Sequence, residues 1–295
     1  MITRITLLFV LLGSAAAAQL DPARLELLTG LKGTWNAAQG VFKVMRPRND
    51  LPVTVDGWKM PPFMGLTSWA AFSAGKDNEA MVMGDLVLFE DEVNPVMSAL
   101  LDSGLEVTAL HNHFFYDEPR VYFMHIGGEG AADKLAGGVK LAFAKQQEIR
   151  AANPTPRRGF GGSIPTPSSL GAAPLEAILG AKAQAKDGMV KFVFGREATM
   201  DCGCRVGADM GINTWAALAG AEGDAVVDGD FAVHENELQT VLKSLRASGI
   251  NIVAIHHHMT GESPRYLFIH YWGRGPAASL AHSLKTALNA QTAVK

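Results

Sequence analysis

One sequence pattern occurs twice in this chain, and each copy holds three histidines at the same spacing. The first copy runs Ala109-Leu110-His111-Asn112-His113 and ends in Phe123-Met124-His125. The second runs Ala254-Ile255-His256-His257-His258 and ends in Phe268-Ile269-His270. A chain duplicated in this way is expected to form two similar compact modules. Because the repeat keeps histidines as well as glycines and apolar residues, it indicates a site that both units share.

The duplication extends over most of the chain. Gly84-Asp85 corresponds to Gly229-Asp230, and Trp69-Ala70-Ala71 corresponds to Trp215-Ala216-Ala217. Between the copies, Pro, Gly and Ser are too dense for a packed core and predict a linker. We therefore divide the chain into a signal peptide (1–18), a first repeat module (19–150), a linker (151–174) and a second repeat module (175–295).

Residues 1–18 have the pattern of a cleavable secretory signal. Arg4 precedes an apolar run, and Ala16-Ala17-Ala18 stands before Gln19. The apolar run is too short to span a bilayer. We expect a periplasmic or secreted protein with no stable membrane anchor after signal cleavage.

Charge and cysteine content narrow the expected partners. The formal net charge is −3, and no basic run exceeds Arg157-Arg158, so nucleic acid is not an expected partner. We expect a small molecule or an envelope component instead. The only cysteines, Cys202 and Cys204, have no counterpart in the first copy and stand apart from the shared site. They are interpreted as a strained disulfide, with a metal-ligand pair or a redox pair as alternatives.

The pattern of apolar residues predicts an α+β fold. Apolar runs at 68–73 and 80–89 predict strands, and helical spacing over 90–102 predicts a helix that ends at Ser103-Gly104. Residues 106–115 and 120–126 predict a β-hairpin, and 131–149 a closing helix, repeated at 276–291. We expect two tandem modules, each an antiparallel sheet with a His-bearing hairpin and packed helices. The Gly84-Asp85 and Gly229-Asp230 pairs predict bulges or turns inside strands, or else Asp85 and Asp230 each orient an imidazole.

The hairpin brings the histidines together. Residues two apart share a strand face, and a turn centred near Asp117-Glu118 places His125 opposite His111 and Phe123 opposite His113. The same spacing groups His256, His258 and His270 in the second copy. Three neutral imidazoles suit a divalent metal, zinc more than copper because most methionines fit the apolar core. The alternative is a polar face or a ligand-contacting cluster without metal.

Charged residues near the hairpins supply further candidates. Candidates for a catalytic base or an extra metal ligand are Glu90 and Glu92, with their counterparts Glu235 and Glu237. The alternative is first-turn charge favoured by the helix dipole. Arg120 and Arg265 are candidates for binding an anionic ligand, and the alternative is pairing with nearby carboxylates such as Glu118.

The segments Ala109–His113 and Pro119–Ile126, together with the preceding Glu90–Pro95, resemble the LppY/LpqO family. That family consists of exported bacterial proteins and mycobacterial lipoproteins built on a domain of unknown function. The resemblance covers nearly all of the mature chain and implies the duplication and the export, but it brings no established activity. This chain departs from the lipoprotein members because it has no lipobox cysteine.

Three functional hypotheses remain. The first is an exported protein whose duplicated three-histidine sites bind a divalent metal and a small anionic ligand. The second is a zinc-dependent hydrolase of the cell envelope, since an open coordination position activates bound water. The third is a metal-free ligand-binding or interaction module. The sequence leaves open whether the histidines form two sites or one composite site.

Overall fold

The computed structural model describes residues 20–76 and 79–293. The predicted signal peptide, residues 1–18, lies outside the described residues. No helix in the described ranges is long and apolar enough to cross a membrane.

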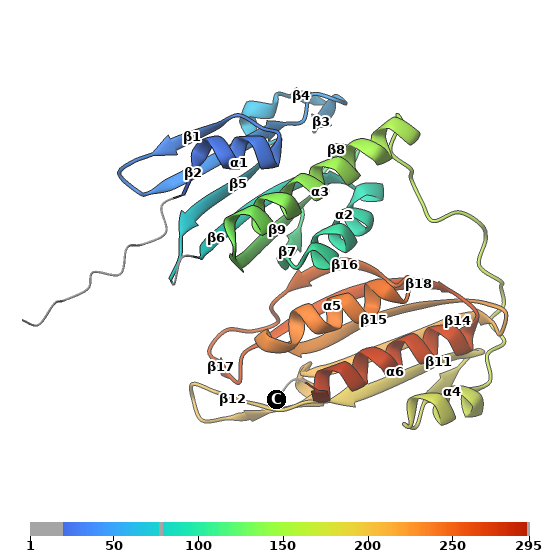
Figure 1. Cartoon of the computed structure of the whole chain (residues 1–295). Helices are drawn as coiled ribbons and strands as arrows, with labels where there is room; N and C mark the ends of the chain where they lie inside the picture. Colours follow the sequence, from blue (N-terminus) through green and yellow to red (C-terminus); the bar gives the residue numbers. More distant parts are fainter. Residues whose placement is uncertain (1–19, 77–78, 294–295) are drawn as a thin grey trace, which may run out of the picture.

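The first module begins with a short helix, and its two longer helices follow strands later in the chain (Figure 1). Its elements are α1 (Pro22–Thr29), β1 (Gly33–Asn36), β2 (Val41–Pro47), β3 (Val53–Val55), β4 (Trp58–Met60), η1 (Pro62–Met64), β5 (Thr67–Ala74), β6 (Ala80–Phe89), α2 (Glu90–Ser103), β7 (Glu106–His111), β8 (Asp117–Glu118), β9 (Val121–Gly130) and α3 (Ala132–Ala152). The predicted helix over 90–102 is confirmed, and it ends as expected because Gly104 adopts a left-handed conformation, with φ 86°.

The second module repeats this order. Its elements are α4 (Ala172–Leu179), β10 (Gln184–Lys186), β11 (Met189–Gly195), β12 (Ala198–Met200), β13 (Arg205–Val206), η2 (Ala208–Met210), β14 (Asn213–Ala221), β15 (Asp224–His234), η3 (Glu235–Glu237), α5 (Leu238–Ala247), β16 (Asn251–His256), β17 (Glu262–Ser263), β18 (Tyr266–Gly275) and α6 (Ala277–Ala293). Residues 153–171, between α3 and α4, contain neither helix nor strand.

Both modules share one twelve-stranded sheet, in the order β1-β2-β5-β6-β9-β7-β16-β18-β15-β14-β11-β10, and every neighbouring pair is antiparallel. The modules join where β7 pairs with β16, with Leu110 opposite Ile255. Figure 1 shows these two strands at the centre of the molecule. The α+β class with two similar modules is confirmed, and the continuous sheet is an addition that the repeat did not predict.

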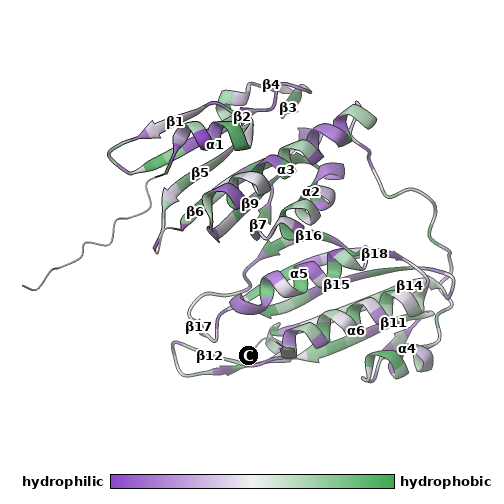
Figure 2. Cartoon of the chain, viewed as in Figure 1, coloured by the Kyte–Doolittle hydropathy of each residue, from purple (hydrophilic) through white to green (hydrophobic). Residues whose placement is uncertain are grey.

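The helices cover one face of the sheet (Figure 1). Beneath them lie buried strand residues such as Phe42, Phe72 and Phe231, which form one apolar core across both modules. Along α3 and α6, hydrophilic and hydrophobic residues alternate (Figure 2), as is typical of helices that pack one side on a sheet. The opposite side of the sheet, here called the open face, carries the alternate strand residues. They include Lys43, Trp69, Met83, Asp85, His125, Lys191, Trp215, Asp230 and His270.

Two small sheets cover the ends of the open face. The sheet β4-β3-β8 buries Val87, Phe89 and Phe123, and the sheet β13-β12-β17 covers Ala232 and Phe268 in the same way. A disulfide links Cys202 to Cys204 in the turn between β12 and β13. The small sheets therefore leave the central part of the open face, where the histidines lie, as the accessible part.

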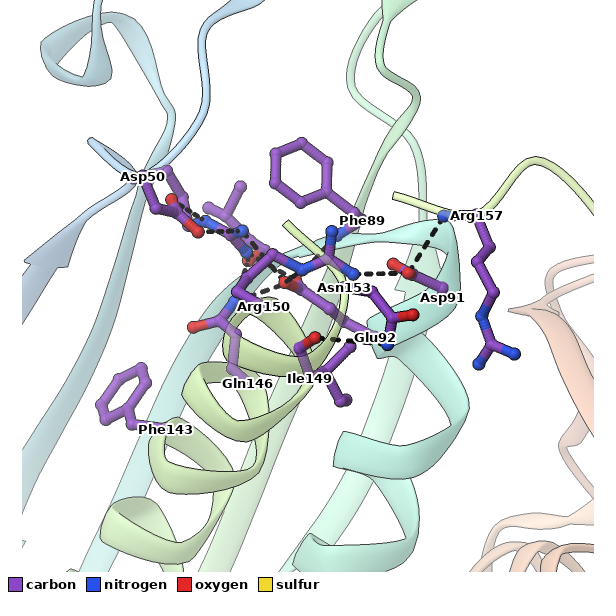
Figure 3. A network of polar contacts seen from close by, with 12 residues as sticks. Asp50, Phe89, Asp91, Glu92, Phe143, Gln146, Ile149, Arg150, Asn153 and Arg157 are labelled. Atoms are coloured by element: carbon purple, nitrogen blue, oxygen red, sulfur yellow. Dashed lines mark hydrogen bonds and ion pairs between the residues drawn. The ribbon is translucent and has the colours of Figure 1, made fainter. Parts of the chain in front are cut away.

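A buried charge network fixes the start of α2 in the first module (Figure 3). Glu92 is fully buried, accepts hydrogen bonds from Arg48 at 2.6 and 3.1 Å and from Gln146 at 3.2 Å, and pairs with Arg150 at 2.9 Å. It also accepts a hydrogen bond from the backbone N–H of Phe89, which caps the helix. The second module repeats the arrangement with Arg196, Glu237 and Gln291.

Two local predictions need correction. In the hairpin, His111 lies opposite Phe123 and His125 lies opposite Ala109, a register two residues away from the predicted one. The difference arises because β7 ends at His111, and residues 112–116 form a longer irregular turn than the composition suggested. The hairpin itself is confirmed.

The predicted bulge at Gly84-Asp85 is wrong, because both residues lie in regular pairing within β6. The irregularities occur instead in β7 and β16. Glycine is needed at 84 for space: a Cβ there would lie 2.6 Å from the carbonyl oxygen of Trp69. At the equivalent Gly229, a Cβ would lie 2.1 Å from the hydroxyl of Tyr271.

Candidate metal centre

One group of potential metal ligands occurs in the described part of the chain. Asp230, His256 and His258 offer ligand atoms that all lie within 4.8 Å of one another. Asp230 comes from β15, His256 ends β16, and His258 lies in the turn that follows β16. Two of the three histidines predicted in the second copy therefore meet, together with a buried carboxylate.

Main-chain carbonyl groups fix the ring tautomers of all three predicted histidines in this copy. Nδ1 of His256 lies 3.0 Å from the carbonyl oxygen of Phe268, and Nδ1 of His258 lies 3.1 Å from that of Gly211. Nδ1 of His270 lies 3.2 Å from the carbonyl oxygen of Gly229. Since a carbonyl oxygen only accepts, each Nδ1 carries the proton, and each neutral ring keeps its lone pair on Nε2. Metal-binding histidines are oriented in the same manner.

Only one oxygen of the Asp230 carboxylate has a partner in the described residues. Its Oδ2 lies 3.1 Å from Nε2 of His258, and its Oδ1 is buried with no hydrogen-bond partner in the described residues. A neutral His258 would direct a lone pair at a carboxylate oxygen, which is repulsive. A cation between Nε2 and Oδ2, either a proton or a metal ion, removes that repulsion.

Burial favours the neutral, metal-binding form of His256. Burial lowers the pKa of His256, although the hydrogen bond to Phe268 and the charge of Asp230 act in the opposite direction. The ring of His258 stacks on the ring of Phe268, with centroids 3.4 Å apart, which limits its movement. The carbonyl contacts of both rings and the stacking of His258 thus orient the two imidazoles.

His270 lies beside this group and is not a member of it. Its ring stacks on that of His256 with centroids 4.8 Å apart, and its backbone pairs with Asp230 across β18 and β15. His257, which the second copy adds, directs Nδ1 to the carbonyl oxygen of Tyr266 at 3.2 Å. The side chain of His257 thus contacts the backbone of the second hairpin strand and not the ligand group.

The first copy repeats the histidine cluster with different ring contacts. The ring of His111 lies 5.1 Å from those of both His113 and His125, and His113 stacks on Phe123 at 3.3 Å. Burial lowers the pKa of His113, and the neighbouring imidazole of His111 lowers it further. Asp85, like Asp230, buries an Oδ1 atom with no partner in the described residues. All three predicted histidines of this copy are together.

Both clusters lie on the open face, arranged about the β7–β16 junction. In each copy four residues line up across neighbouring strands: Trp69, Asp85, His125 and Ala109 in the first, Trp215, Asp230, His270 and Ala254 in the second. Because β7 and β16 are antiparallel, the two rows approach the junction from opposite sides and are related by a pseudo-twofold axis. His111 and His256, which lie on the two joined strands, are the histidines nearest that axis.

The predicted carboxylates and arginines lie outside the group Asp230–His256–His258. Glu90 begins α2 and lies 3.6 Å from Arg120, a partner that the sequence did not suggest. Glu90 follows Asp85 by five residues, which is about 16 Å along an extended strand. Glu235 and Arg265 are exposed at equivalent positions of the second module. Catalytic and ligand-binding roles for these four residues stay predictions.

Sequence reasoning did not identify Asp230 as a potential metal ligand. Asp85 and Asp230 were expected in a bulge or behind an imidazole, whereas Asp230 belongs to the ligand group itself. The available signal was their repetition, since a Gly-Asp pair recurs in both copies at the offset of the histidines.

Comparisons with known proteins identify a family but no activity. The sequence model of one family, described as Domain of Unknown Function (DUF1259), matches residues 23–145 and again residues 173–290. No curated protein matches the chain.

Two solved structures show a faint likeness to this chain. The ethanolamine utilization protein EutL from Leptotrichia buccalis C-1013-b is 10% identical over 75% of this chain and 82% of that chain, with a TM-score of 0.19. The trimeric bacterial microcompartment shell protein PduB is 10% identical over 88% of this chain and 89% of that chain, with a TM-score of 0.18. TM-scores this low carry no argument about fold or function.

Proposed function

This chain belongs to the DUF1259 family, and we propose that it is an exported protein that binds a divalent metal, zinc in the first instance, on the open face of its sheet. The observation that carries the proposal is the group Asp230–His256–His258. In both rings Nδ1 carries the proton, and Oδ1 of Asp230 is buried without a hydrogen-bond partner in the described residues. Two imidazoles and a carboxylate are hard-to-borderline ligands, a set that suits zinc.

The spacing of the ligand atoms fits zinc after a small closure. Two ligand atoms of a tetrahedral zinc site lie about 3.3 Å apart, since each bond is about 2.0–2.2 Å long. The ligand atoms of Asp230, His256 and His258 already lie within 4.8 Å of one another. Side-chain rotations that move each ligand atom by up to about 1 Å therefore bring the three atoms to zinc-binding distance.

Export is part of the proposal. The signal-like pattern of residues 1–18 supports it, and so does the disulfide between Cys202 and Cys204, because disulfides persist in oxidising compartments. The resemblance to the LppY/LpqO family agrees with both observations. Localisation of the full-length chain by cell fractionation, beside a chain that begins at Gln19, tests this part.

Metal content tests the binding. We expect the mature protein, purified without a histidine tag, to contain one or two equivalents of zinc by mass spectrometry. A double variant, His256→Ala with Asp230→Asn, loses at least one equivalent. His282→Ala is the matched control, because His282 is exposed on α6, away from the open face, and its loss leaves the zinc content unchanged.

The number of bound ions decides between two sites and one. Two equivalents, with one lost in the double variant and the other lost in His111→Ala, indicate separate sites in the two copies. One equivalent that disappears in either variant indicates a composite site across the β7–β16 junction. Absence of metal even after incubation with zinc contradicts the proposal and favours a metal-free ligand-binding module.

A zinc-dependent hydrolase is the second candidate function. It is supported by the three-residue ligand set, which leaves a fourth position on the metal for a water molecule; zinc lowers the pKa of such a water to about 7. If Glu235 or Glu90 acts as the base, Glu235→Gln or Glu90→Gln abolishes turnover of an envelope-derived ester or peptide while zinc content stays the same. Unchanged turnover in both variants removes these glutamates from the reaction.

A further inference from the structure

We propose that the cavity between the linker and the two modules is a binding site for a small organic anion bearing a phosphate or carboxylate group, which Arg157 and Arg246 recognise. The site is distinct from the histidine clusters and does not depend on the proposed metal. Its walls come from three separate parts of the chain: α2, the linker, and the segment from α5 to β16.

The cavity has a volume of about 440 Å³. Its walls include Asn94 and Pro95 of α2, Arg246 at the end of α5, Asn251 at the start of β16, and linker residues 157–160. Cavities of about 300–1,000 Å³ are typical of small-molecule sites. A ligand bound here contacts both modules and the linker at the same time.

Arg246 is a half-buried cation that has no counter-ion among the described residues. Its Nε donates to Ser98 at 3.1 Å, and its Nη1 donates to the carbonyl oxygen of Ile250 at 2.8 Å and to Asn251 at 2.9 Å. All three acceptors are neutral, and Nη2 has no partner in residues 20–76 and 79–293. Burial lowers the pKa of Arg246, and no described carboxylate offsets the effect. The guanidinium still stays charged at neutral pH, so it attracts an anion.

Arg157 brings a second free guanidinium to the same cavity. Its backbone N–H donates to Oδ2 of Asp91 at 3.0 Å, which fixes the linker to α2. Figure 3 shows its side chain pointing away from Asp91, and no ion pair engages the guanidinium in the described ranges. The backbone anchor holds this residue at the cavity while its charge remains available.

The acidic residues of the cavity wall already have partners. Asp91 forms a buried ion pair with Arg150, and Glu90 pairs with Arg120. Arg158, which also lines the cavity, pairs with Glu118. The lining holds three arginines against these two carboxylates, so its formal charge is positive, and Arg157 and Arg246 are the two of these arginines that form no ion pair in the described residues.

The remaining wall defines the class of ligand. Phe160 is 68% exposed and lines the cavity together with Pro95, so it offers an apolar surface within the same site. Guanidinium groups bind the paired oxygens of phosphates and carboxylates through two parallel hydrogen bonds. The arrangement thus suits a small organic molecule with one such anionic group and an apolar or aromatic part.

Calorimetric titration of the mature chain tests the site. The probes are phenyl phosphate and benzoate, each with an aromatic ring, at constant ionic strength set with sodium chloride. We expect saturable binding of at least one probe, and a preference between them identifies phosphate or carboxylate as the recognised group. Arg157→Gln weakens this binding about tenfold or more, the typical effect of removing a hydrogen bond between charged groups.

Two controls keep the result specific. Arg205→Gln removes the same charge from an exposed residue outside the cavity and leaves the affinity unchanged. His256→Ala also leaves it unchanged, whereas a loss of probe binding in that variant assigns the anion to the histidine cluster and overturns the proposal. No saturable binding of either probe, or equal affinity in Arg157→Gln and the unmodified chain, overturns it as well.

Discussion

Nε2 of His258 lies 3.1 Å from Oδ2 of Asp230, while Nδ1 of the same ring lies 3.1 Å from the carbonyl oxygen of Gly211. These two contacts place conflicting demands on one neutral imidazole, which has a single proton. The carbonyl takes that proton, and the lone pair then faces a carboxylate. A second proton, which turns the contact into an ion pair, or a metal ion resolves the conflict.

Replacement of Asp230 by asparagine separates metal binding from folding. Asp230→Asn removes a buried charge, so the metal-free variant is expected to be at least as stable as the metal-free unmodified protein. With zinc at 100 times its dissociation constant, the unmodified protein gains about 2.7 kcal/mol, and the variant gains little. Urea unfolding with and without zinc measures both values. A variant that gains as much as the unmodified protein contradicts the ligand role of Asp230.

Loss of the buried charge on Glu92 destabilises the first module strongly. Glu92 is fully buried against Arg48, whose side chain is 3% exposed. Glu92→Gln leaves buried arginines with fewer countercharges, and we expect a loss of about 3 kcal/mol in the free energy of unfolding. Denaturant unfolding measures it.

Glu90→Gln is the control for Glu92→Gln. Glu90 and Arg120 have side chains 41% and 63% exposed, so this variant is expected to lose less than about 1 kcal/mol. For the equivalent Glu237→Gln we expect a loss in unfolding free energy between these two values, because the side chain of Arg196 is 20% exposed. Equal losses in all three variants would mean that burial does not set the strength of these pairs.

Addition of a methyl group at Gly229 is expected to disrupt the strand beside the proposed metal site. A Cβ at Gly229 would lie 2.1 Å from the hydroxyl of Tyr271 and 2.3 Å from the carbonyl oxygen of Trp215. Because these two groups hydrogen-bond to each other at 2.9 Å, Gly229→Ala also breaks that bond. We expect a loss of about 2–3 kcal/mol and weaker zinc binding. In Gly223→Ala, where a Cβ meets nothing within 4 Å, stability stays the same.

Acid is expected to destabilise the second module in two steps. Burial lowers the pKa of His234 below its ordinary 6.5, so the unfolded chain takes up this proton first, and stability falls as the pH drops from 6.5 to the folded value. Burial alone would raise the pKa of Glu237, but hydrogen bonds from Arg196 and from the His234 amide lower it below 4.5. Its stabilisation is therefore lost as the pH falls through that lower value.

The variant His234→Phe isolates the first step. It installs the residue found at the equivalent Phe89, and the fall in unfolding free energy just below pH 6.5 becomes smaller. The fall below pH 4.5 remains, because Glu237 and Arg196 are still present. Unfolding midpoints at a series of pH values measure both. An unchanged profile would show that His234 does not contribute.

Local sequence patterns predicted the elements well. The bounds of α2 follow from its apolar spacing and from Gly104, and the order of strands and helices follows from the duplication. The hairpin register could not be predicted, because the irregular turn after His111 and the bulges in β7 and β16 shift the pairing without leaving a sequence signal. Nor could the partner of Glu90, since Arg120 reaches it only across the fold.

The sequence by itself determined that two similar α+β units each bring three histidines together, because side-chain alternation and chain spacing act within a hairpin. Only the tertiary structure decided that β7 pairs with β16, that both clusters occupy one open face, and that Asp230 joins His256 and His258. These outcomes depend on contacts between residues far apart in the chain. They form because burying one core across both modules and pairing the exposed strand edges is favourable, and neither effect can be read from a local pattern.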